Sequence, residues 1–306
     1  MRFLVYSFKF DWRVGGIVVL NKLANLLAQE GHETFIIDGS EKNNNGAINI
    51  DIEQAIELAK DKETVVIYPE VIIGNPLKAK KVARWILFFP GFHGGEKQFD
   101  DSEYIFTYNK AFVANTPYQS TTEIRIVETM VNHFYDLGLE RLEDAILIKK
   151  GKQDLEERER IHMQPRSGPL LKVTSADKMI EQSTDISDYN KKLNQVRYFI
   201  SYDNYSYHSI LALLAGCISV VIPELDKTKE IFFAEYPERK SNVLYGFEEN
   251  SIGPQKPELL RDQLNRVELS NIDSVRKLVG EIHGYFNSVN SVKFWRWRGA
   301  TKKTMV

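Results

Sequence analysis

A strand, a polar loop and a glycine-ended helix follow one another without a break in residues 198–224, YFISYDNYSYHSILALLAGCISVVIPE. Residues 198–201 predict a buried strand and residues 203–206 a loop. Residues 209–215 predict a small-residue helix that ends at Gly216, before a second strand. In open parallel sheets, ligands bind outside the carboxyl ends of strands, where loop amides and helix N-termini face anionic groups. The segment therefore predicts half of a nucleotide-binding layer.

The composition restricts the class of protein and its partners. A chain of 306 residues can form two domains that each bury a core. Its formal net charge of −2 gives no general attraction for nucleic acid, so no nucleic-acid partner is expected. Cys217 is the only cysteine, which excludes an internal disulfide and fits a reducing cytoplasm. The opening MRFLVYSF is too short for a signal peptide, and no stretch reaches the roughly 20 apolar residues that cross a bilayer.

The first half of the chain alternates strands and helices. Residues 2–8 predict a strand, residues 17–29 a helix, and residues 34–37 the next strand, which is the order of a parallel βαβ unit. The intervening loop holds Gly15 and Gly16 but lacks the three-glycine dinucleotide fingerprint, so an NAD-dependent oxidoreductase is the least favoured class. Further strands are predicted at residues 64–68, 85–89 and 104–108, and helices at residues 51–59 and 76–84.

The second half repeats this architecture. A strand at residues 145–148 ends in lysines, and the charged stretch 153–169 is predicted to be an exposed loop or a short helix. Later helices are predicted at residues 227–235, 257–265 and 272–287. The tail at residues 293–306 interleaves tryptophans with basic residues, which suits either a helix packed on the protein, the preferred reading, or the surface of an anionic membrane.

The segment 198–224 resembles the donor-binding motif in the C-terminal domain of GT-B glycosyltransferases. Retaining members of that family carry a Glu, seven intervening residues and a second Glu that enters a small-residue, glycine-ended helix. Here Asp203 stands in the first position and Leu211 in the second. In the family the first acid contacts the donor sugar and the second the ribose, so ribose recognition must come from elsewhere. SYDNYSYHS followed by GCISVVIP looks closer to a bacterial subgroup linked to surface-polysaccharide assembly.

The resemblance implies an α/β GT-B fold in which two Rossmann-like domains face a central cleft. Residues 1–140 would form the acceptor-side domain, residues 141–280 the nucleotide-sugar-binding domain, and residues 281–306 a C-terminal helix and basic aromatic tail. The implied activity is that of a cytoplasmic, metal-independent glycosyltransferase without a cofactor. It would transfer a sugar, such as a hexose, from a nucleotide-sugar donor to a glycan or a lipid-linked acceptor. A non-catalytic nucleotide-sugar-binding protein, which Leu211 favours, and a sugar-nucleotide epimerase stay open as alternatives.

Lysines follow the first strand of the second domain, where many GT-B enzymes place basic residues against the donor diphosphate. Lys149, Lys150 and Lys152 stand there. Fixed cations stabilise the charge that develops on a leaving diphosphate, and they do so without a metal. Lysines around a glycine are equally typical of a solvated turn. The sequence shows no metal-binding cluster among its six histidines and no Asp-x-Asp after a strand that would support a metal-dependent GT-A enzyme.

Two residues are candidates for catalysis. His93 lies in the turn PGFHGG, whose glycines let a ligand approach the backbone. In several retaining GT-B families a histidine in a comparable place contacts the donor sugar or the reacting centre, and a neutral imidazole can do so near pH 7. A histidine held in a tight turn by a carbonyl group is the alternative. Asp203 could orient donor hydroxyls or simply begin a turn. Glu70, at another strand end, is a weaker candidate.

The remaining candidates would bind the donor. GT-B enzymes related to this motif often have a Gly-Gly pair that opens the first helix, where amides can approach a phosphate, and Gly15 and Gly16 match that pair. The loop after residue 203 offers hydroxyl and ring groups for phosphate or base, and Ser206 and His208 there are more plausible binders than catalysts. The donor-binding candidates are Gly15, Gly16, Lys149, Lys150, Lys152, Tyr205, Ser206, Tyr207 and His208.

Overall fold

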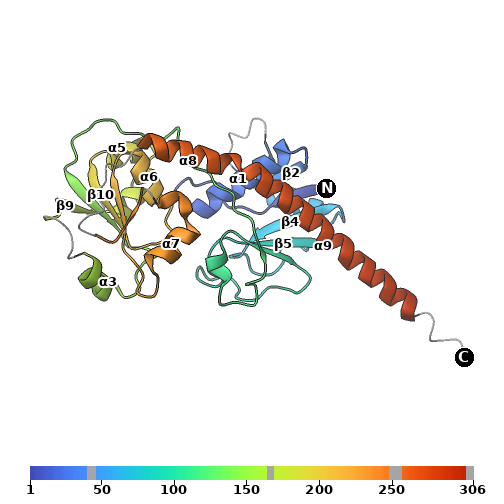
Figure 1. Ribbon diagram of the computed structural model, residues 1–306. Helices are drawn as coiled ribbons and strands as arrows, with labels where there is room; N and C mark the ends of the chain where they lie inside the picture. The colour runs from blue at the N-terminus through green and yellow to red at the C-terminus, as the bar shows by residue number, and fades with distance from the viewer. Residues whose placement is uncertain (40–45, 164–168, 241, 248–256, 301–306) are drawn as a thin grey trace, which may run out of the picture. The chain divides into compact units, whose positions relative to one another are not determined.

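The computed structural model describes residues 1–39, 46–163, 169–240, 242–247 and 257–300 (Figure 1). The chain forms two compact units, one of Met1–Glu128 with Leu269–Val306 and one of Thr129–Glu268. Each unit is built on a parallel sheet with helices, so the predicted α/β class with two Rossmann-like units is confirmed.

The first unit contains a seven-stranded sheet in the order β3-β2-β1-β4-β5-β6-β7, and all of its strand pairs are parallel. The order of the first six strands, 3-2-1-4-5-6, is that of doubly wound nucleotide-binding folds. The strands are β1 (Arg2–Val5), β2 (Glu33–Ile37), β3 (Ile48–Ile50), β4 (Thr64–Pro69), β5 (Lys81–Ile86), β6 (Tyr104–Thr107) and β7 (Thr122–Glu123). The helices are α1 (Gly15–Gln29), α2 (Ile52–Ala59), the 3₁₀ turn η1 (Lys110–Val113) and α9 (Asn271–Ala300).

The C-terminal helix α9 belongs to the first unit. Figure 1 shows it beside α1, and its apolar residues Val275, Leu278 and Ile282 enter the same core cluster as the inner face of α1. The side chain of Asn271 accepts from the Val127 amide at 2.9 Å and donates to the Val127 carbonyl at 2.7 Å. Residues 269–280 therefore lie in the first unit rather than in a second domain ending at residue 280, and the first crossing between units falls at residue 128 rather than 140.

The prediction of a helix over residues 76–84 is wrong, because Lys81–Ile86 form β5, an interior strand between β4 and β6. The strand predicted at residues 85–89 correspondingly ends at Ile86. Arg84 is fully buried within β5, where its guanidinium donates to both carboxylate oxygens of Glu103 at 2.8 Å. A long-range ion pair of this kind lets an arginine occupy an interior strand position, and the local sequence carries no sign of it.

The second unit contains a five-stranded sheet in the order β12-β11-β10-β8-β9, again with parallel pairs only. The strands are β8 (Glu143–Leu147), β9 (Lys172–Ser175), β10 (Val196–Ser201), β11 (Ile218–Val221) and β12 (Leu244–Tyr245). The helices are α3 (Leu155–His162), α4 (Ala176–Glu181), α5 (Ile186–Leu193), α6 (His208–Leu214), α7 (Lys229–Glu235), the 3₁₀ turn η2 (Pro237–Arg239) and α8 (Pro257–Leu269). Numbered within the unit, the order is 2-1-3-4-5, and the chain reverses its direction of winding between β8 and β10.

The strand, loop, helix and strand predicted within residues 198–224 are confirmed as β10, α6 and β11. All seven residues of α6 are buried, which explains their small and apolar character. Gly216 ends the helix with a φ of 86°, a left-handed conformation that favours glycine. The local pattern therefore fixed these elements to within a few residues.

Candidate functional site

Two loops meet at the carboxyl ends of β8 and β10, the winding reversal of the second sheet. Gly151 follows β8, and a Cβ atom on it would stand 2.0 Å from the Tyr202 carbonyl oxygen and 2.7 Å from the Asp203 amide nitrogen. Only glycine permits so close an approach of two backbones. The loop that carries Lys149, Lys150 and Lys152 is thereby packed against the loop that begins at Asp203. This edge is where ligands bind in sheets of this order.

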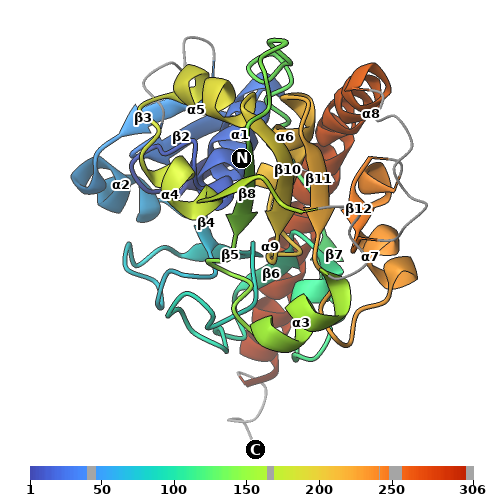
Figure 2. The ribbon, with the colours of Figure 1, turned by 90° about the vertical axis from the view of Figure 1, so that its left-hand side faces the viewer.

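The buried side chain of Arg158 donates hydrogen bonds to the backbone of both loops. It is 2% exposed, and its Nη2 donates to the carbonyls of Tyr202 and Ile222, both at 2.7 Å. Nη1 donates to Gly151 at 3.0 Å, and Nε donates to Pro223 at 2.9 Å. Burial lowers the pKa of this guanidinium. Figure 2 shows α3, which carries Arg158, beyond the ends of the strands β8, β10 and β11.

No pattern in the sequence marks Arg158 as a buried residue. It belongs to the charged stretch 153–169, where the predicted short helix is confirmed as α3 but the predicted exposure does not hold for this residue. The helix sequence LEERERIH has no apolar periodicity that would mark one arginine as interior. Its burial depends on carbonyl groups from three strand ends that are distant in sequence.

Asp203 is a buried carboxyl group at the junction of the two loops, with 6% of its surface exposed. Its Oδ1 accepts from the Tyr205 amide at 2.9 Å, and its carbonyl accepts from the Ser201 hydroxyl at 2.8 Å. Burial raises its pKa, and the positive charges of Lys150 and Arg239 act against that rise. A carboxylate held in this way can accept hydrogen bonds from ligand hydroxyl groups.

The three lysines differ in their surroundings. The ammonium of Lys149 pairs with Glu181 of α4 at 3.2 Å, and both side chains are exposed. The Lys149 amide donates to Asp177 at 3.2 Å, which anchors the start of the loop. Lys150 interacts electrostatically with Asp203, and Lys152 is exposed. Lys150 and Lys152 are therefore the better placed cations at the junction with the β10 loop.

The loop after Asp203 is held in a single shape. The carbonyls of Asn204 and Ser206 each accept from the buried guanidinium of Arg239 at 3.2 Å. The Ser206 hydroxyl accepts from the His208 amide at 3.2 Å and so closes a local turn. Arg239 was not among the residues predicted from the sequence. It holds this loop by hydrogen bonds to backbone carbonyls, as Arg158 holds the strand ends.

The aromatic members of the loop are partly or wholly buried. Tyr205 accepts a hydrogen bond from the Lys227 ammonium at 2.9 Å, and burial raises its pKa. The His208 ring is 7% exposed and lies edge-on to Tyr189 with a centroid distance of 5.6 Å. Tyr207 is half-buried beside His208, with ring centroids 4.3 Å apart. Leu211, in the position of the second motif acid, is buried inside α6.

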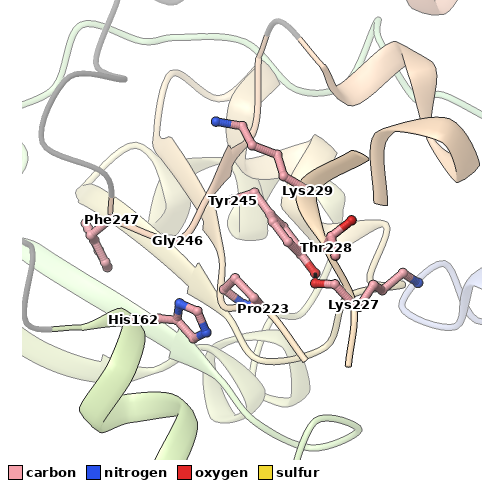
Figure 3. A pocket seen from close by; sticks show the side chains of 8 residues that line it. All are labelled: His162, Pro223, Lys227, Thr228, Lys229, Tyr245, Gly246 and Phe247. Atoms are coloured by element: carbon pink, nitrogen blue, oxygen red, sulfur yellow. Dashed lines mark hydrogen bonds between the residues drawn. The ribbon is translucent and has the colours of Figure 1, made fainter. Parts of the chain in front are cut away.

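A pocket of about 240 Å³ opens at the carboxyl ends of β11 and β12 (Figure 3). Pro223 follows β11 and Gly246 follows β12, whereas His162 is the last residue of α3. None of its residues was among the sequence candidates. The lining residues are His162, Pro223, Lys227, Thr228, Lys229, Tyr245, Gly246 and Phe247.

In the first unit, Gly15 and Gly16 begin α1 directly after the loop that follows β1. Val14 precedes them and gives no side-chain cap. A Cβ atom on Gly16 would lie 3.8 Å from Leu87 Cδ1, an ordinary contact distance, so packing does not require glycine there. The backbone amides of Gly15 and Gly16, in the first turn of α1, lie at the carboxyl edge of the first sheet, near Leu87 at the end of β5.

His93 lies in the turn region after β5 and is exposed. Its ring contacts Phe88 and Phe92, at centroid distances of 5.5 and 4.9 Å. Gly91 and Gly94 on either side have φ angles of 82° and 84°. Glu70 is instead buried, and its carboxylate accepts from the Leu87 amide at 2.9 Å, which gives it a structural role between β4 and β5.

Neither a metal cluster nor a membrane-crossing helix is found among the described residues. Within the described ranges, no group of three or more His, Cys, Asp or Glu side chains is arranged to hold a metal ion. Within the same ranges, no helix combines the length and apolar character that crossing a membrane requires. The tail residues 301–306 lie outside the described residues, and so do the side chains of residues 289–300, including both tryptophans of the basic aromatic segment.

Comparison with known proteins gives distant structural likenesses. No protein-family model matches the chain, and no curated protein matches it. An α-glucosyltransferase solved with UDP and a 13-mer DNA is 10% identical, with a TM-score of 0.44 over 90% of this chain and 95% of that one. The phage T4 enzyme BGT, solved with UDP and Mn²⁺, is 11% identical, with a TM-score of 0.39 over 99% of both chains. The glycotransferase of kitacinnamycin is 10% identical, with a TM-score of 0.37 over 93% of this chain and 95% of that one. All three TM-scores are below 0.5, which is a distant likeness of fold.

Proposed function

We propose that this chain is a glycosyltransferase that moves a sugar, such as a hexose, from a nucleotide-sugar donor to a glycan or a lipid-linked acceptor. The observation that carries the proposal is the contact of Gly151 with the backbone of Tyr202 and Asp203. It places a lysine-bearing loop against a loop with a buried acid, at the edge where sheets of this order bind nucleotides. The motif resemblance of residues 198–224 concerns one of these two loops.

The donor would bind to the second unit. Lys150 and Lys152 would hold the diphosphate and stabilise its increasing negative charge as the glycosidic bond breaks, so the proposal requires no metal. Asp203 would accept hydrogen bonds from hydroxyls of the donor sugar. Ser206, Tyr205, Tyr207 and His208 would shape the surrounding loop. Because Lys149 already pairs with Glu181, its proposed contribution is the smallest of the three lysines.

The first unit would supply the acceptor side. In addition, the amides that open α1 at Gly15 and Gly16 would approach a phosphate of the donor, and the exposed His93 would contact the donor sugar or the reacting centre. The acceptor class follows from the resemblance to a bacterial subgroup linked to surface polysaccharides, as does the proposed place in the cytoplasm. The formal net charge of −2 favours no nucleic acid as partner.

A binding and turnover experiment tests the proposal. Isothermal titration with UDP, dTDP, GDP and ADP measures affinity, and NMR follows a panel of sugar nucleotides with and without glycan acceptors. Wild-type protein should bind at least one nucleoside diphosphate and release it from the matching sugar nucleotide. The double variant Lys150→Ala, Lys152→Ala should bind it at least about tenfold more weakly, since each lysine contributes a charge-assisted contact. Lys172→Ala, at an exposed lysine of β9, is the matched control.

The same experiment separates the alternatives. Tight nucleotide binding without turnover on any acceptor would indicate a non-catalytic binding protein, the reading that Leu211 favours. A new sugar nucleotide in the NMR spectrum, formed without an acceptor, would indicate an epimerase. Absence of nucleotide binding by the wild-type protein would contradict the proposal as a whole.

A further inference from the structure

The pocket at the ends of β11 and β12 has the size and walls of a site for a single ring system. Its volume of about 240 Å³ lies below the about 300–1,000 Å³ of pockets that enclose whole drug-sized ligands. Ring side chains contribute to its lining, and Figure 3 shows His162 and Phe247 on one side of Pro223, with Tyr245 on the other. Flat apolar surfaces of this kind favour a planar heterocycle over a hydrated sugar.

The walls of the pocket are fixed by contacts outside it. The Tyr245 ring stacks on Phe232 with a centroid distance of 4.5 Å, and its hydroxyl donates to the Lys227 carbonyl at 2.9 Å. Phe247 packs edge-on against Tyr198 of β10 at 5.5 Å. The Lys227 ammonium, in a side chain that is 7% exposed, is occupied by Glu235 and Tyr205. A preformed pocket of this kind needs little ordering when a ligand binds.

His162 supplies a polar edge to this ring-lined pocket. Its imidazole makes no hydrogen bond to any of the described residues, although it is half-buried. Burial, assisted by the charge of Arg158, lowers its pKa, so the ring is neutral at pH 7. A neutral imidazole has one donor and one acceptor nitrogen, and it can therefore recognise the polar edge of a heterocycle.

Hydrogen bonds of Arg158 and Lys227 link the wall of the pocket to the junction of the β8 and β10 loops. Arg158 donates to the carbonyl of Pro223, which lines the pocket, and also to the carbonyls of Gly151 and Tyr202 at the junction. Lys227 of the pocket donates to Tyr205 of the β10 loop. These contacts put the pocket and the lysine-bearing loop on one hydrogen-bonded framework, so the two are candidates for the two ends of a single ligand.

We propose that this pocket binds the heterocyclic base of the donor nucleotide and that His162 determines which base is accepted. The inference rests on the proposed function, because it takes the donor to be a nucleotide sugar. It adds a place for the base and a residue that selects it, which the motif resemblance does not supply. The selection arises because a base that cannot pair with the imidazole lacks a hydrogen bond that the preferred base makes in the pocket.

Titration of two His162 variants tests the proposal. His162→Phe keeps a ring of similar shape without hydrogen-bonding atoms, and His162→Gln keeps a donor and an acceptor. Each is titrated with UDP, dTDP, GDP, ADP and inorganic pyrophosphate, beside wild type and Arg160→Ala, an exposed position on the same helix. His162→Phe should bind the preferred nucleotide about tenfold more weakly, with its base preference reduced and its pyrophosphate affinity unchanged. His162→Gln should recover part of the loss, and Arg160→Ala should match wild type.

Saturation-transfer NMR on the wild-type protein gives a second readout that does not depend on a variant folding. The base protons of the preferred nucleotide should receive more saturation than its ribose protons. If wild-type protein binds a nucleotide but His162→Phe retains both its affinity and its base preference, the pocket assignment is overturned and the proposed function stands. If wild-type protein binds no nucleotide, the proposed function fails first and takes this inference with it.

Discussion

The Arg158 guanidinium donates to the Tyr202 carbonyl at 2.7 Å, although 44 residues separate them in the chain. Tyr202 is the residue immediately before Asp203, and the same guanidinium holds Gly151 and Pro223. One buried side chain thus fixes the lysine loop, the acid loop and one wall of the pocket relative to each other. All of these partners are backbone carbonyl groups. The hydrogen bonds of Arg158 therefore set the positions of the two loops as well as stabilising the folded protein.

Replacement of Arg158 should therefore affect both folding and binding. Arg158→Lys keeps the charge but cannot reproduce a planar fork that reaches several carbonyls, so we expect a loss of about 2–4 kcal/mol in the free energy of unfolding. Nucleotide affinity should also fall in the folded fraction. Urea unfolding and isothermal titration measure the two effects. Arg160→Ala on the same helix should change neither, and an Arg158→Lys protein of wild-type stability would contradict the proposed role.

Gly151→Ala should separate the two loops. The added Cβ would stand 2.0 Å from the Tyr202 carbonyl oxygen, a distance at which backbone must move. We expect a destabilisation of about 1–3 kcal/mol and a marked loss of diphosphate affinity. Gly280→Ala in α9 is the matched control, since nothing lies within 4 Å of its added Cβ and alanine is the better helix former by about 1 kcal/mol. Thermal unfolding should therefore shift in opposite directions for the two variants.

Asp203→Asn should change stability in a pH-dependent way. Burial raises the pKa of Asp203 in the folded protein, so the folded state binds this proton more tightly than the unfolded state. Stability from this group is then present at low pH and is lost as pH rises through the raised pKa. We expect Asp203→Asn to melt above wild type at pH 7, with the difference shrinking towards pH 4, while turnover falls. A melting difference that is independent of pH would exclude a buried, titrating Asp203.

His93→Ala should reduce turnover while leaving nucleotide affinity unchanged. The proposed contact of His93 is with the reacting sugar, and a positioned acid, base or hydrogen-bonding group typically contributes about 10²-fold or more to the rate. The expected result is a fall in kcat of about that size with an unaltered dissociation constant for the nucleotide diphosphate. His133→Ala is a suitable control, because that histidine is also exposed but belongs to no proposed site. An equal effect of both variants would remove His93 from the mechanism.

The sequence by itself determined the elements whose signals are local. The apolar run and the closing Gly216 fixed β10, α6 and β11, and Asp51 marked the start of α2, where its side chain accepts from the Gln54 amide at 2.8 Å. The lysines and Asp203 were also found at strand ends, because a strand followed by a polar loop is a contiguous pattern.

Only the tertiary structure decided where α9 packs, why Arg84 and Arg158 are buried, and that a pocket exists beside His162. Each of these depends on groups far apart in the chain: the core of the first unit for α9, Glu103 for Arg84, and carbonyls from three strand ends for Arg158. Periodicity reports which side of an element faces an interior, but it does not report which distant partner makes a charged side chain acceptable there.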